Sequence, residues 1–338
     1  MTANAAADEA AQAELDKASG DAGKPAQGGI AGKSPMRIAL GRLRRDWIAM
    51  VSLGFVVFFI LVAVFAPLIC KIFGVSTATV LVSQYLDPLT GMPKTGPPYH
   101  GFDIHHPFGM SPGTAHDNLA WWIYGCRTSL EIATMATVVS IGLGVTLGLL
   151  AGFLGGAVDK AISFVTDFFM TIPFLLAALV MAPIINDRFN TSDHYKDIQF
   201  WVLVGVLSIF GWMGIARLIR GEVLSLRERE FVQAARVLGM PTRRILVREL
   251  LPNLTAPIIV SVSLSLPTFV AAEAGFAYLG IGITGGVSWG QVINDATSFF
   301  QTYPLYLWEP LLGVLVLVLA LNLLGDAIRD AFDPKSRR

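Results

Sequence analysis

The amino-acid sequence predicts an all-α membrane protein with six transmembrane helices. Of the 338 residues, 54% are hydrophobic and only 15% are charged, and the apolar residues occur in long uninterrupted blocks. A soluble domain of this size carries about a quarter charged residues. Because a helix satisfies its own backbone hydrogen bonds in lipid, apolar blocks of this kind predict membrane-spanning helices.

Six blocks are long enough to cross about 30 Å of hydrocarbon as helices. They lie near residues 48–69, 128–151, 158–185, 200–220, 256–281 and 307–328. The first block follows a polar segment and lacks a small-residue cleavage site, so we expect a retained span rather than a signal peptide. Pro173, Pro257 and Pro267 should kink or break the third and fifth spans.

The remaining segments follow in order along the chain. Residues 1–35 are rich in Ala, Asp, Gly and Lys, which predicts a disordered cytoplasmic tail. Residues 36–127 should comprise an amphipathic helix on the membrane surface (36–47), the first span and a long extracytoplasmic loop rich in Pro and Gly. Residues 128–330 should form a five-span core, and residues 331–338 a second cytoplasmic tail.

Lys and Arg placement predicts the orientation. Basic residues are dense before the first span, in the loop after the fourth span and at the C-terminus, and they are sparse in the three alternate loops. The positive-inside rule therefore places both termini in the cytoplasm.

The most informative segment is the loop at residues 228–253, EREFVQAARVLGMPTRRILVRELLPN. Helix formers run through FVQAARVL, Gly239 interrupts them, and a second helix, TRRILVREL, should end before Pro252. This predicts a polar helix–glycine–helix hairpin, in which the small residues Ala234 and Ala235 would let another protein surface approach closely. Composition alone would fit an ordinary basic cytoplasmic loop equally well.

The spacing of this loop resembles the signature of ABC-importer permeases, in which Glu-Ala-Ala is followed by three residues, Gly, nine residues and Ile-x-Leu-Pro. Gln233 stands where the family has Glu, and Glu249 stands where it has Ile. In the family this loop is the coupling helix, which docks into a groove on the cytoplasmic ATPase subunit. The residues that the resemblance assigns to docking are Glu230, Gln233, Ala234, Ala235, Arg236, Gly239, Arg243, Arg244, Leu251, Pro252 and Asn253.

Further segments extend the resemblance to the C-type subunit of the dipeptide/oligopeptide/nickel branch. They are YGCRTSL (124–130), GFLGGAVD (152–159), EAGFAYLGIGI (273–283) with SWG (288–290), and NLLGDAIRDAFDP (322–334). One departure is HPFGMSPGTAHDN (106–118), where relatives usually carry a Gly-Thr-Asp…Gly-Arg-Asp run.

The resemblance implies a type I ABC importer permease in the bacterial cytoplasmic membrane. Its partners would be a second homologous permease subunit, two cytoplasmic ATPase subunits and an extracytoplasmic substrate-binding protein, with no nucleic acid. The chain itself would be no enzyme and hold no cofactor, because ATP and Mg would bind to the ATPase subunits. Peptides are the expected cargo; nickel or another small solute, and a non-ABC secondary transporter, remain alternatives.

Two motifs resemble catalytic or nucleotide-binding loops. GGIAGKS (28–34) approaches a phosphate-binding loop, but Gln27 occupies the first glycine position and no strand precedes it. GMSPG (109–113) matches a nucleophile elbow around Ser111, which requires a sheet that an all-α protein does not provide. We expect a disordered segment and a turn, respectively.

The long loop also carries residues able to bind metal or to form a disulfide. Imidazole and carboxylate suit nickel or zinc, but the residues lack the helical spacing of a preformed site, so a solvated loop is expected. Cys70 and Cys126 stand at its two ends, where an oxidising exterior would permit a bridge; two unrelated small apolar residues are the favoured interpretation. The candidate metal ligands are His100, His105, His106, His116, Asp103 and Asp117.

Ionisable residues inside apolar spans are costly and usually face the bundle interior or a water-filled path. Glu273 and Asp167 are therefore candidates for the translocation pathway or for the interface with the partner permease. A structural hydrogen bond inside the bundle would explain Glu273 equally well. Asp159, Arg217 and Arg220 should lie close enough to the cytoplasm to reach it.

Overall fold

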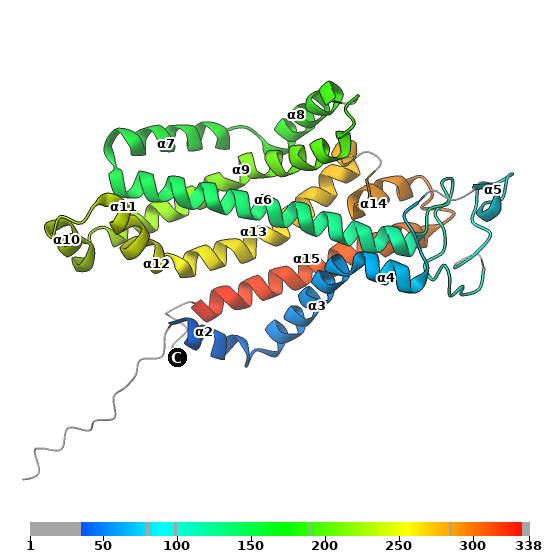
Figure 1. The fold of residues 1–338 in the computed structure, drawn as a ribbon, viewed down its shortest axis with the longest axis horizontal. Coiled ribbons are helices and arrows are strands. Elements are labelled where there is room, and N and C mark those ends of the chain that lie inside the picture. Colours follow the sequence, from blue (N-terminus) through cyan, green and yellow to red (C-terminus); the bar gives the residue numbers. More distant parts are fainter. Residues whose placement is uncertain (1–34, 79–81, 98–99, 190, 284–285, 333–338) are drawn as a thin grey trace, which may run out of the picture. The chain divides into compact units, whose positions relative to one another are not determined.

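The protein is described by a computed structural model that covers residues 35–78, 82–97, 100–189, 191–283 and 286–332. The predicted tails at 1–35 and 331–338 lie almost entirely outside the described residues, as does the GGIAGKS segment. The described residues from 39 to 332 form one body of packed helices (Figure 1). Within the described residues, β pairing is limited to two isolated bridges, Leu86–Pro93 and Met110–Asp117.

Five helices in the described part of the chain are long and apolar enough to cross a membrane. Each overlaps a predicted span, and Figure 1 shows four of them (α6, α9, α13 and α15) running side by side. The five are α3 (Trp47–Val64), α6 (Asn118–Leu154), α9 (Tyr195–Leu226), α13 (Thr255–Phe276) with its π-helical extension η2 (Ala277–Ile281), and α15 (Pro304–Phe332).

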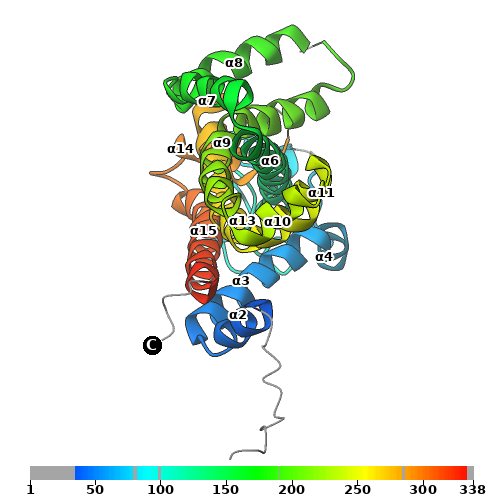
Figure 2. The ribbon, with the colours of Figure 1, turned by 90° about the vertical axis from the view of Figure 1, so that its left-hand side faces the viewer.

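The third predicted span, 158–185, is broken instead of continuous. α7 (Gly156–Met170) and α8 (Phe174–Phe189) meet at a bend of 84°, and counting this pair as one span gives the predicted six. Pro173 lies in the break. Proline interrupts a helix because it has no N–H to donate and its ring clashes with the preceding turn. Figures 1 and 2 both show α7 and α8 at one margin of the bundle.

The fifth span is less interrupted than predicted. Pro257 stands in the first turn of α13, where a missing amide costs no helical hydrogen bond, and α13 continues through Pro267. The break comes later, at Gly280 in η2, where φ is 81°.

Short helices precede and follow the first span along the chain. The predicted surface helix at 36–47 ends early because Asp46 caps the next helix, its carboxylate accepting hydrogen bonds from the amides of Ile48 and Ala49. The short helices are α2 (Pro35–Leu43), α4 (Ala66–Phe73) and α5 (Val82–Tyr85).

The second span begins earlier than predicted. α6 starts at Asn118 with Asp117 as its N-cap. The indole of Trp122, in the first turns, donates to the carbonyl of Glu309 on α15 (3.0 Å). Asn, Trp, Tyr and Arg side chains lower the mean hydropathy of residues 118–127, so the predicted apolar block began after them. The predicted loop at 70–127 is correspondingly shorter.

The two cysteines pack as separate buried residues. Cys70 lies in α4 and Cys126 lies within α6, and both are free. The Cys126 thiol points at the carbonyl of Phe59 on α3 (3.6 Å). The disulfide alternative is therefore not realised.

Three glycines on one face of α6 bring this helix into backbone contact with α9. A Cβ atom added at Gly144, Gly148 or Gly152 would lie only 2.7–2.8 Å from atoms of α9. Residues four apart share one helix face, and small residues there let two helices approach closely in a membrane. This stripe therefore fixes how α6 and α9 pack.

At the other end of α6, a buried tryptophan joins three helices. Trp289 is the first residue of α14 (Trp289–Thr297), and its indole donates to the carbonyl of Trp122 (2.9 Å). Gly125 on α6 and Gly313 on α15 leave room for the ring, since a Cβ there would lie 2.9 and 3.0 Å from indole atoms. The indole thus locks α14 to α6 and α15.

The segment at 228–253, called the hairpin below, begins as predicted and ends differently. The predicted second helix does not stop before Pro252. A π-turn precedes this proline and places it at the start of the next short helix, where its missing amide is tolerated. The elements are α10 (Glu230–Val237), α11 (Thr242–Ile245), η1 (Leu246–Leu250) and α12 (Leu251–Asn253).

The glycine contact generates a first prediction. Gly148→Leu should lower the free energy of unfolding by at least about 1–3 kcal/mol, because the new side chain overpacks the contact between α6 and α9. Thermal unfolding of the purified protein in detergent measures the change. Gly142→Leu is the matched control, since a Cβ at Gly142 meets no atom within 4 Å. Equal destabilisation by both variants would contradict the packing argument.

Candidate functional site

The hairpin is anchored to the ends of α6 and α9 by polar contacts. The Arg227 guanidinium donates to the carbonyl of Gly152 at the end of α6 (3.1 Å). The side-chain amide of Gln233 donates to the backbone carbonyl of Arg227 (2.9 Å), just after the last turn of α9. A glutamate carboxylate has no hydrogen to donate to this carbonyl. Gln233, the departure from the family motif, therefore has an internal role.

Gly239 ends α10 in a Schellman motif. The amide of Gly239 donates to the carbonyl of Arg236, and the amide of Met240 donates to the carbonyl of Ala235, both at 3.0 Å. Gly239 has φ 73°, a left-handed conformation that glycine adopts without strain. A Cβ at this position would meet no atom within 4 Å, so conformation alone explains the glycine.

An apolar core fixes the hairpin to the bundle. Ala235 is buried in this core, so of the two small residues predicted to face a partner only Ala234 is exposed. The guanidinium of Arg236 lies over the ring of Phe153, 4.6 Å from its centroid. The buried members of this core are Phe153, Ile215, Ile219, Val223, Val232, Ala235, Ile245, Leu250 and Leu254.

The tip of the hairpin carries two exposed apolar side chains that sequence reasoning missed. Val237 is 87% exposed and Leu238 is 81% exposed, directly before Gly239. Their signal was present in the sequence, as two apolar residues at the end of a short polar helix. Exposed apolar side chains outside the apolar spans favour contact with another protein.

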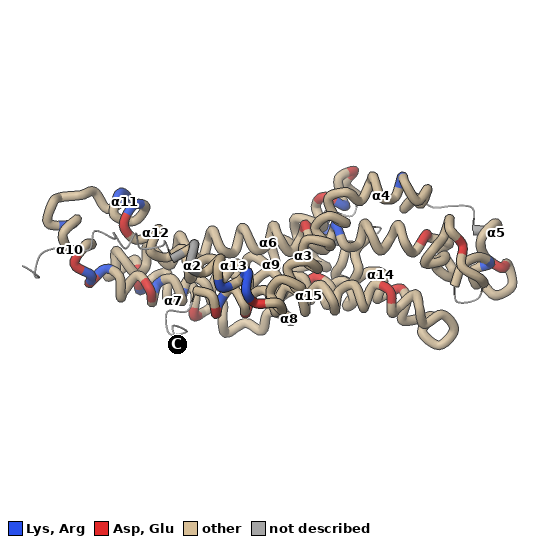
Figure 3. The backbone as a smooth tube through the Cα atoms, turned by 90° about the horizontal axis from the view of Figure 1, so that it is seen from below, with Lys and Arg blue, Asp and Glu red and all other residues tan. Residues whose placement is uncertain are grey.

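Charged and polar residues surround this tip. Glu230, Arg243 and Arg244 are exposed, and Figure 3 shows residues of both signs together at α10 and α11. Pro252 and Asn253 are also exposed at the return to α13, whereas Leu251 is half-buried. The hairpin thus presents an apolar point within a charged rim.

Glu273 lies at a closed junction of α6, α13 and α14. Its side chain is fully buried, and the hydroxyls of Ser129 and Ser288 face it. Close contacts close this junction, because a Cβ at Gly290 would lie 2.5 Å from the carbonyl of Ala274. Neither carboxyl oxygen of Glu273 has a hydrogen-bond partner of good geometry. The residue therefore faces the interior of its own chain.

Asp167 has the opposite environment. It lies on α7, its side chain is 66% exposed, and it accepts a hydrogen bond of 2.6 Å from Arg217 on α9. One turn away on α9, Arg220 forms a two-pronged ion pair with Asp159 (2.5 and 2.8 Å). The two aspartates and two arginines join the margin helix α7 to the bundle.

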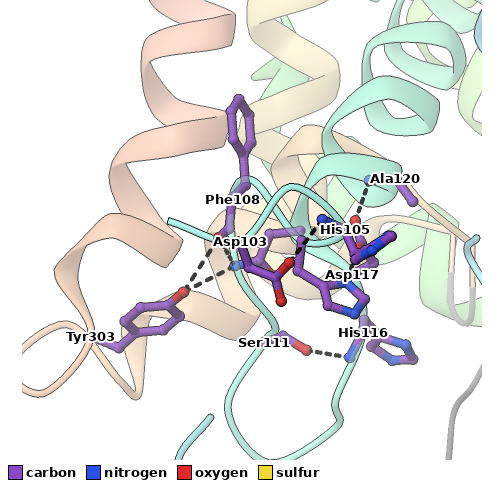
Figure 4. Close-up of polar contacts among 10 residues, drawn as sticks. Asp103, His105, Phe108, Ser111, His116, Asp117, Ala120 and Tyr303 are labelled. Carbon is purple, nitrogen blue, oxygen red and sulfur yellow. Dashed lines mark hydrogen bonds and ion pairs between the residues drawn. The ribbon is translucent and has the colours of Figure 1, made fainter. Parts of the chain in front are cut away.

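The long loop, residues 86–117 without 98 and 99, folds onto the start of α15. The hydroxyl of Tyr303 donates to the carbonyl of Pro97 (2.8 Å), and the amide of Asn118 donates to the carbonyl of Phe108 (3.0 Å). Figure 4 shows Tyr303 directed at Phe108. Gly109 permits this contact, since a Cβ there would lie 2.7 Å from the Tyr303 hydroxyl. The loop is therefore an ordered structure.

The histidines of the long loop do not converge. His106 pairs with Asp117 at 2.6 Å, His116 stacks on Trp121 with ring centroids 4.1 Å apart, and the amide of His105 donates to Asp103 (2.9 Å). Burial lowers the pKa of His116. In the part of the chain that the structure describes, no group of three or more His, Cys, Asp or Glu residues is placed to hold a metal ion.

Ser111 contributes to a turn, as predicted for GMSPG. Its hydroxyl accepts from the amide of His116 (2.8 Å) and shares a hydrogen bond with Thr114 (2.8 Å). Gly109 and Gly113, on either side, have φ values of 74° and 75°. The serine stabilises the loop and shows no catalytic arrangement among the described residues.

The sequence matches two known families. Residues 144–338 match the family described as "Binding-protein-dependent transport system inner membrane component". Residues 34–75 match "N-terminal TM domain of oligopeptide transport permease C". The first match covers more than half of the chain and includes the whole hairpin.

Several named permease proteins are similar to this chain over two thirds of its length or more. A dipeptide transport system permease protein of Alkalihalophilus pseudofirmus is 31% identical, over 90% of this chain and 91% of its own length. The oligopeptide transport system permease protein of Bacillus subtilis is 30% identical, over 89% and 90% of the two chains. The corresponding oligopeptide permease of Mycobacterium tuberculosis is 36% identical, over 67% and 78%.

A solved structure with the same fold is the inward-facing MetNI methionine ABC transporter. The superposition covers 64% of this chain and 97% of the MetNI chain, with a TM-score of 0.50 and 19% identity. This likeness confirms the predicted type I importer permease fold.

The Schellman motif generates a second prediction. Gly239→Ala should destabilise the end of α10 by about 1 kcal/mol, because alanine is strained in the left-handed region. Hydrogen exchange of the α10 amides measures this loss. Gly239→Asn is the control, since asparagine tolerates positive φ better; similar exchange rates in both variants would contradict a purely conformational role.

Asp117 generates a third prediction. Burial raises its pKa above the ordinary 3.8, against hydrogen bonds from His106 and Ala120. The native state therefore retains a proton that the unfolded chain has released, so the free energy of unfolding should fall as pH rises from about 4. Asp117→Asn, which can still cap α6, should remove this fall.

The measurement is the pH dependence of thermal unfolding. Asp87→Asn is the comparison, because hydrogen bonds from the backbone amide of Leu89 and the hydroxyl of Thr90 lower the pKa of Asp87. That variant should leave the fall above about pH 4 unchanged. An identical profile for the wild type and Asp117→Asn would show that Asp117 is not the titrating group.

Proposed function

This chain belongs to the family of binding-protein-dependent transport system inner membrane components, and we propose that it forms one transmembrane half of an ATP-driven importer of dipeptides or oligopeptides. The relatives described above carry these substrates in their names, at 30–36% identity. They support peptides over nickel or another small solute as cargo.

In the proposed importer, partner subunits would carry out every chemical step. A second homologous permease subunit would complete the pathway, and two ATPase subunits would bind ATP and Mg and carry out hydrolysis. The chain itself would hold no cofactor and act as no enzyme. Its own contribution would be a pathway and two docking surfaces.

The exposed apolar tip of the hairpin is the observation that carries this proposal. Val237 and Leu238 project from a segment that is anchored to both α6 and α9. Two apolar side chains within a charged rim suit a groove on an ATPase subunit, with Glu230, Arg243 and Arg244 as charged contacts at the edge. Desolvation of the tip would supply affinity, and the rim would select the partner.

The anchoring also suggests how movement is transmitted. Because the hairpin shares a core with α6 and α9, a displacement of the tip would move both helices as one body. ATP binding would draw the docked hairpins together and favour an outward-facing arrangement; hydrolysis would release it. This is a population shift driven by differential contacts at the hairpin.

The long loop is the candidate docking surface for the external binding protein. Leu89, Phe102 and Ile104 are large apolar residues exposed on this loop, and Leu89 is 95% exposed. The hydrogen bonds from Tyr303 and Asn118 hold the loop in place. An ordered surface with apolar contacts favours specific docking.

The orientation that fits this assembly has the hairpin and both termini in the cytoplasm and the long loop outside, across a bacterial cytoplasmic membrane. The dense arginines of the hairpin support it. Glu273, enclosed within the chain, would hold the junction of α6, α13 and α14, and would reach the pathway only if α14 moved. Asp167 is the better candidate for the pathway.

A test of the docking proposal is Leu238→Asp in the reconstituted complex. Burying a carboxylate in an apolar groove is costly, so peptide-driven ATPase activity and ATP-driven dipeptide uptake should both fall at least tenfold. Leu238→Met, which keeps the side chain apolar, should retain both activities. Wild-type behaviour of a correctly assembled Leu238→Asp complex would show that the tip is not a docking surface.

A further inference from the structure

A polar pocket opens between α6, α7 and α9. Its volume is about 420 Å³, within the range of about 300–1,000 Å³ that is typical of small-molecule sites. Small and polar side chains form much of its wall. The residues on which the argument rests are Ala151 from α6, Ser163, Thr166 and Asp167 from α7, and Arg217 and Arg220 from α9.

The charged wall of this pocket lies along α7 and α9, some turns away from the helix ends that lead to the cytoplasmic loops of the predicted topology. At about 1.5 Å per residue, Arg217 stands about 13 Å from the Leu226 end of α9, and Asp167 stands about 16 Å from the start of α7. Both side chains are more than half exposed in this chain. Because exposed charges on membrane helices almost always face the bundle interior or a water-filled cavity, we expect this face to meet water or another protein.

The two ion pairs of this region differ in how many hydrogen-bonding groups they leave available to a ligand. Arg220 uses two nitrogens to hold Asp159, and that pair is largely covered. Arg217 uses one nitrogen for Asp167, which leaves donors of Arg217 and an oxygen of Asp167 open to the pocket. An exposed ion pair contributes only about 0–1 kcal/mol, so it opens at little cost.

An opened Arg217–Asp167 pair complements a small zwitterion. A guanidinium binds a carboxylate through parallel hydrogen bonds, and a carboxylate accepts from an ammonium group. An extended dipeptide spans about 7 Å between its charged ends, which the pocket accommodates. Each broken ion-pair contact would be replaced by one with the peptide, so binding would be weak and reversible, as passage through a membrane requires.

We propose that this pocket is a transient peptide site, in which Arg217 binds the terminal carboxylate of a dipeptide and Asp167 binds its terminal ammonium group. This inference rests on the proposed peptide import and assigns the residues that would recognise the cargo within the membrane. Ser163 and Thr166 would line the side of the bound peptide.

The test is protection of a thiol introduced by Ser163→Cys against a water-soluble methanethiosulfonate reagent. The native Cys70 and Cys126 are buried, which limits background reaction. The full complex is placed in phosphatidylglycerol nanodiscs without the binding protein, and alanyl-alanine is added. Alanyl-alanine should slow modification, whereas acetyl-alanyl-alanine amide, with no charged termini, should not. Asp167→Asn should raise the half-protecting concentration about tenfold, and Asp167→Glu should restore most of the protection.

Several outcomes would overturn the inference. Equal protection by the two peptides would mean that the termini are not recognised. Protection by phosphatidylethanolamine alone, with no added effect of peptide, would identify a zwitterionic lipid headgroup as the ligand. Binding-protein-dependent uptake by the wild-type complex is measured in parallel. Uptake without protection would refute only the pocket, whereas loss of uptake and of peptide-driven ATPase activity in the wild type would refute peptide import itself.

Discussion

The glycine stripe of α6 brings the backbones of α6 and α9 together, and the two proposed docking surfaces are attached to the helix pair that this contact holds in place. Gly144, Gly148 and Gly152 leave no room for a Cβ against α9. In lipid, helices gain little from hydrophobic burial, so close van der Waals contact must hold them together. The hairpin core begins at this contact, because Ile219 and Val223 belong to both.

At the other end of α6, glycines again permit close packing, here against a tryptophan side chain. Gly125 and Gly313 admit the indole of Trp289, which joins α14 to two spans. The long loop then rests on the start of α15 through Tyr303. Glycine thus permits close packing at both ends of one helix, next to the hairpin and next to the loop.

Charge within the spans is used sparingly and in two distinct ways. Glu273 is enclosed at a junction of helices, whereas Asp167 and Arg217 are paired on an open face. The bend at Pro173 lets α7 lie at the margin of the bundle, where the two ion pairs join it to α9. A polar pocket lies between these helices and α6.

Much of the fold followed from the sequence because membrane spans depend on local composition. The apolar blocks overlap the helices of the structure, and the break at Pro173 was predicted from its missing amide. The start of α6 was not, because its Asn, Trp and Tyr residues lower the hydropathy of a stretch in which Trp122 binds to α15 and α14. Likewise, the predicted helix was expected to end before Pro252, whereas in the structure the preceding π-turn places this proline at the start of α12.

The candidate site likewise has features that the sequence predicted and features that it did not. Gly239 and the hairpin could be recognised from spacing, because a helix end and a left-handed residue are local properties. That Ala235 is buried, that Gln233 binds the carbonyl of Arg227, and that Val237 and Leu238 project could not be read from spacing, since these depend on which face packs against α6 and α9. The sequence by itself determined the number of apolar blocks, their predicted orientation and the hairpin; only the tertiary structure decided which side chains remain free to meet a partner or a ligand, because burial is a property of contacts between distant segments.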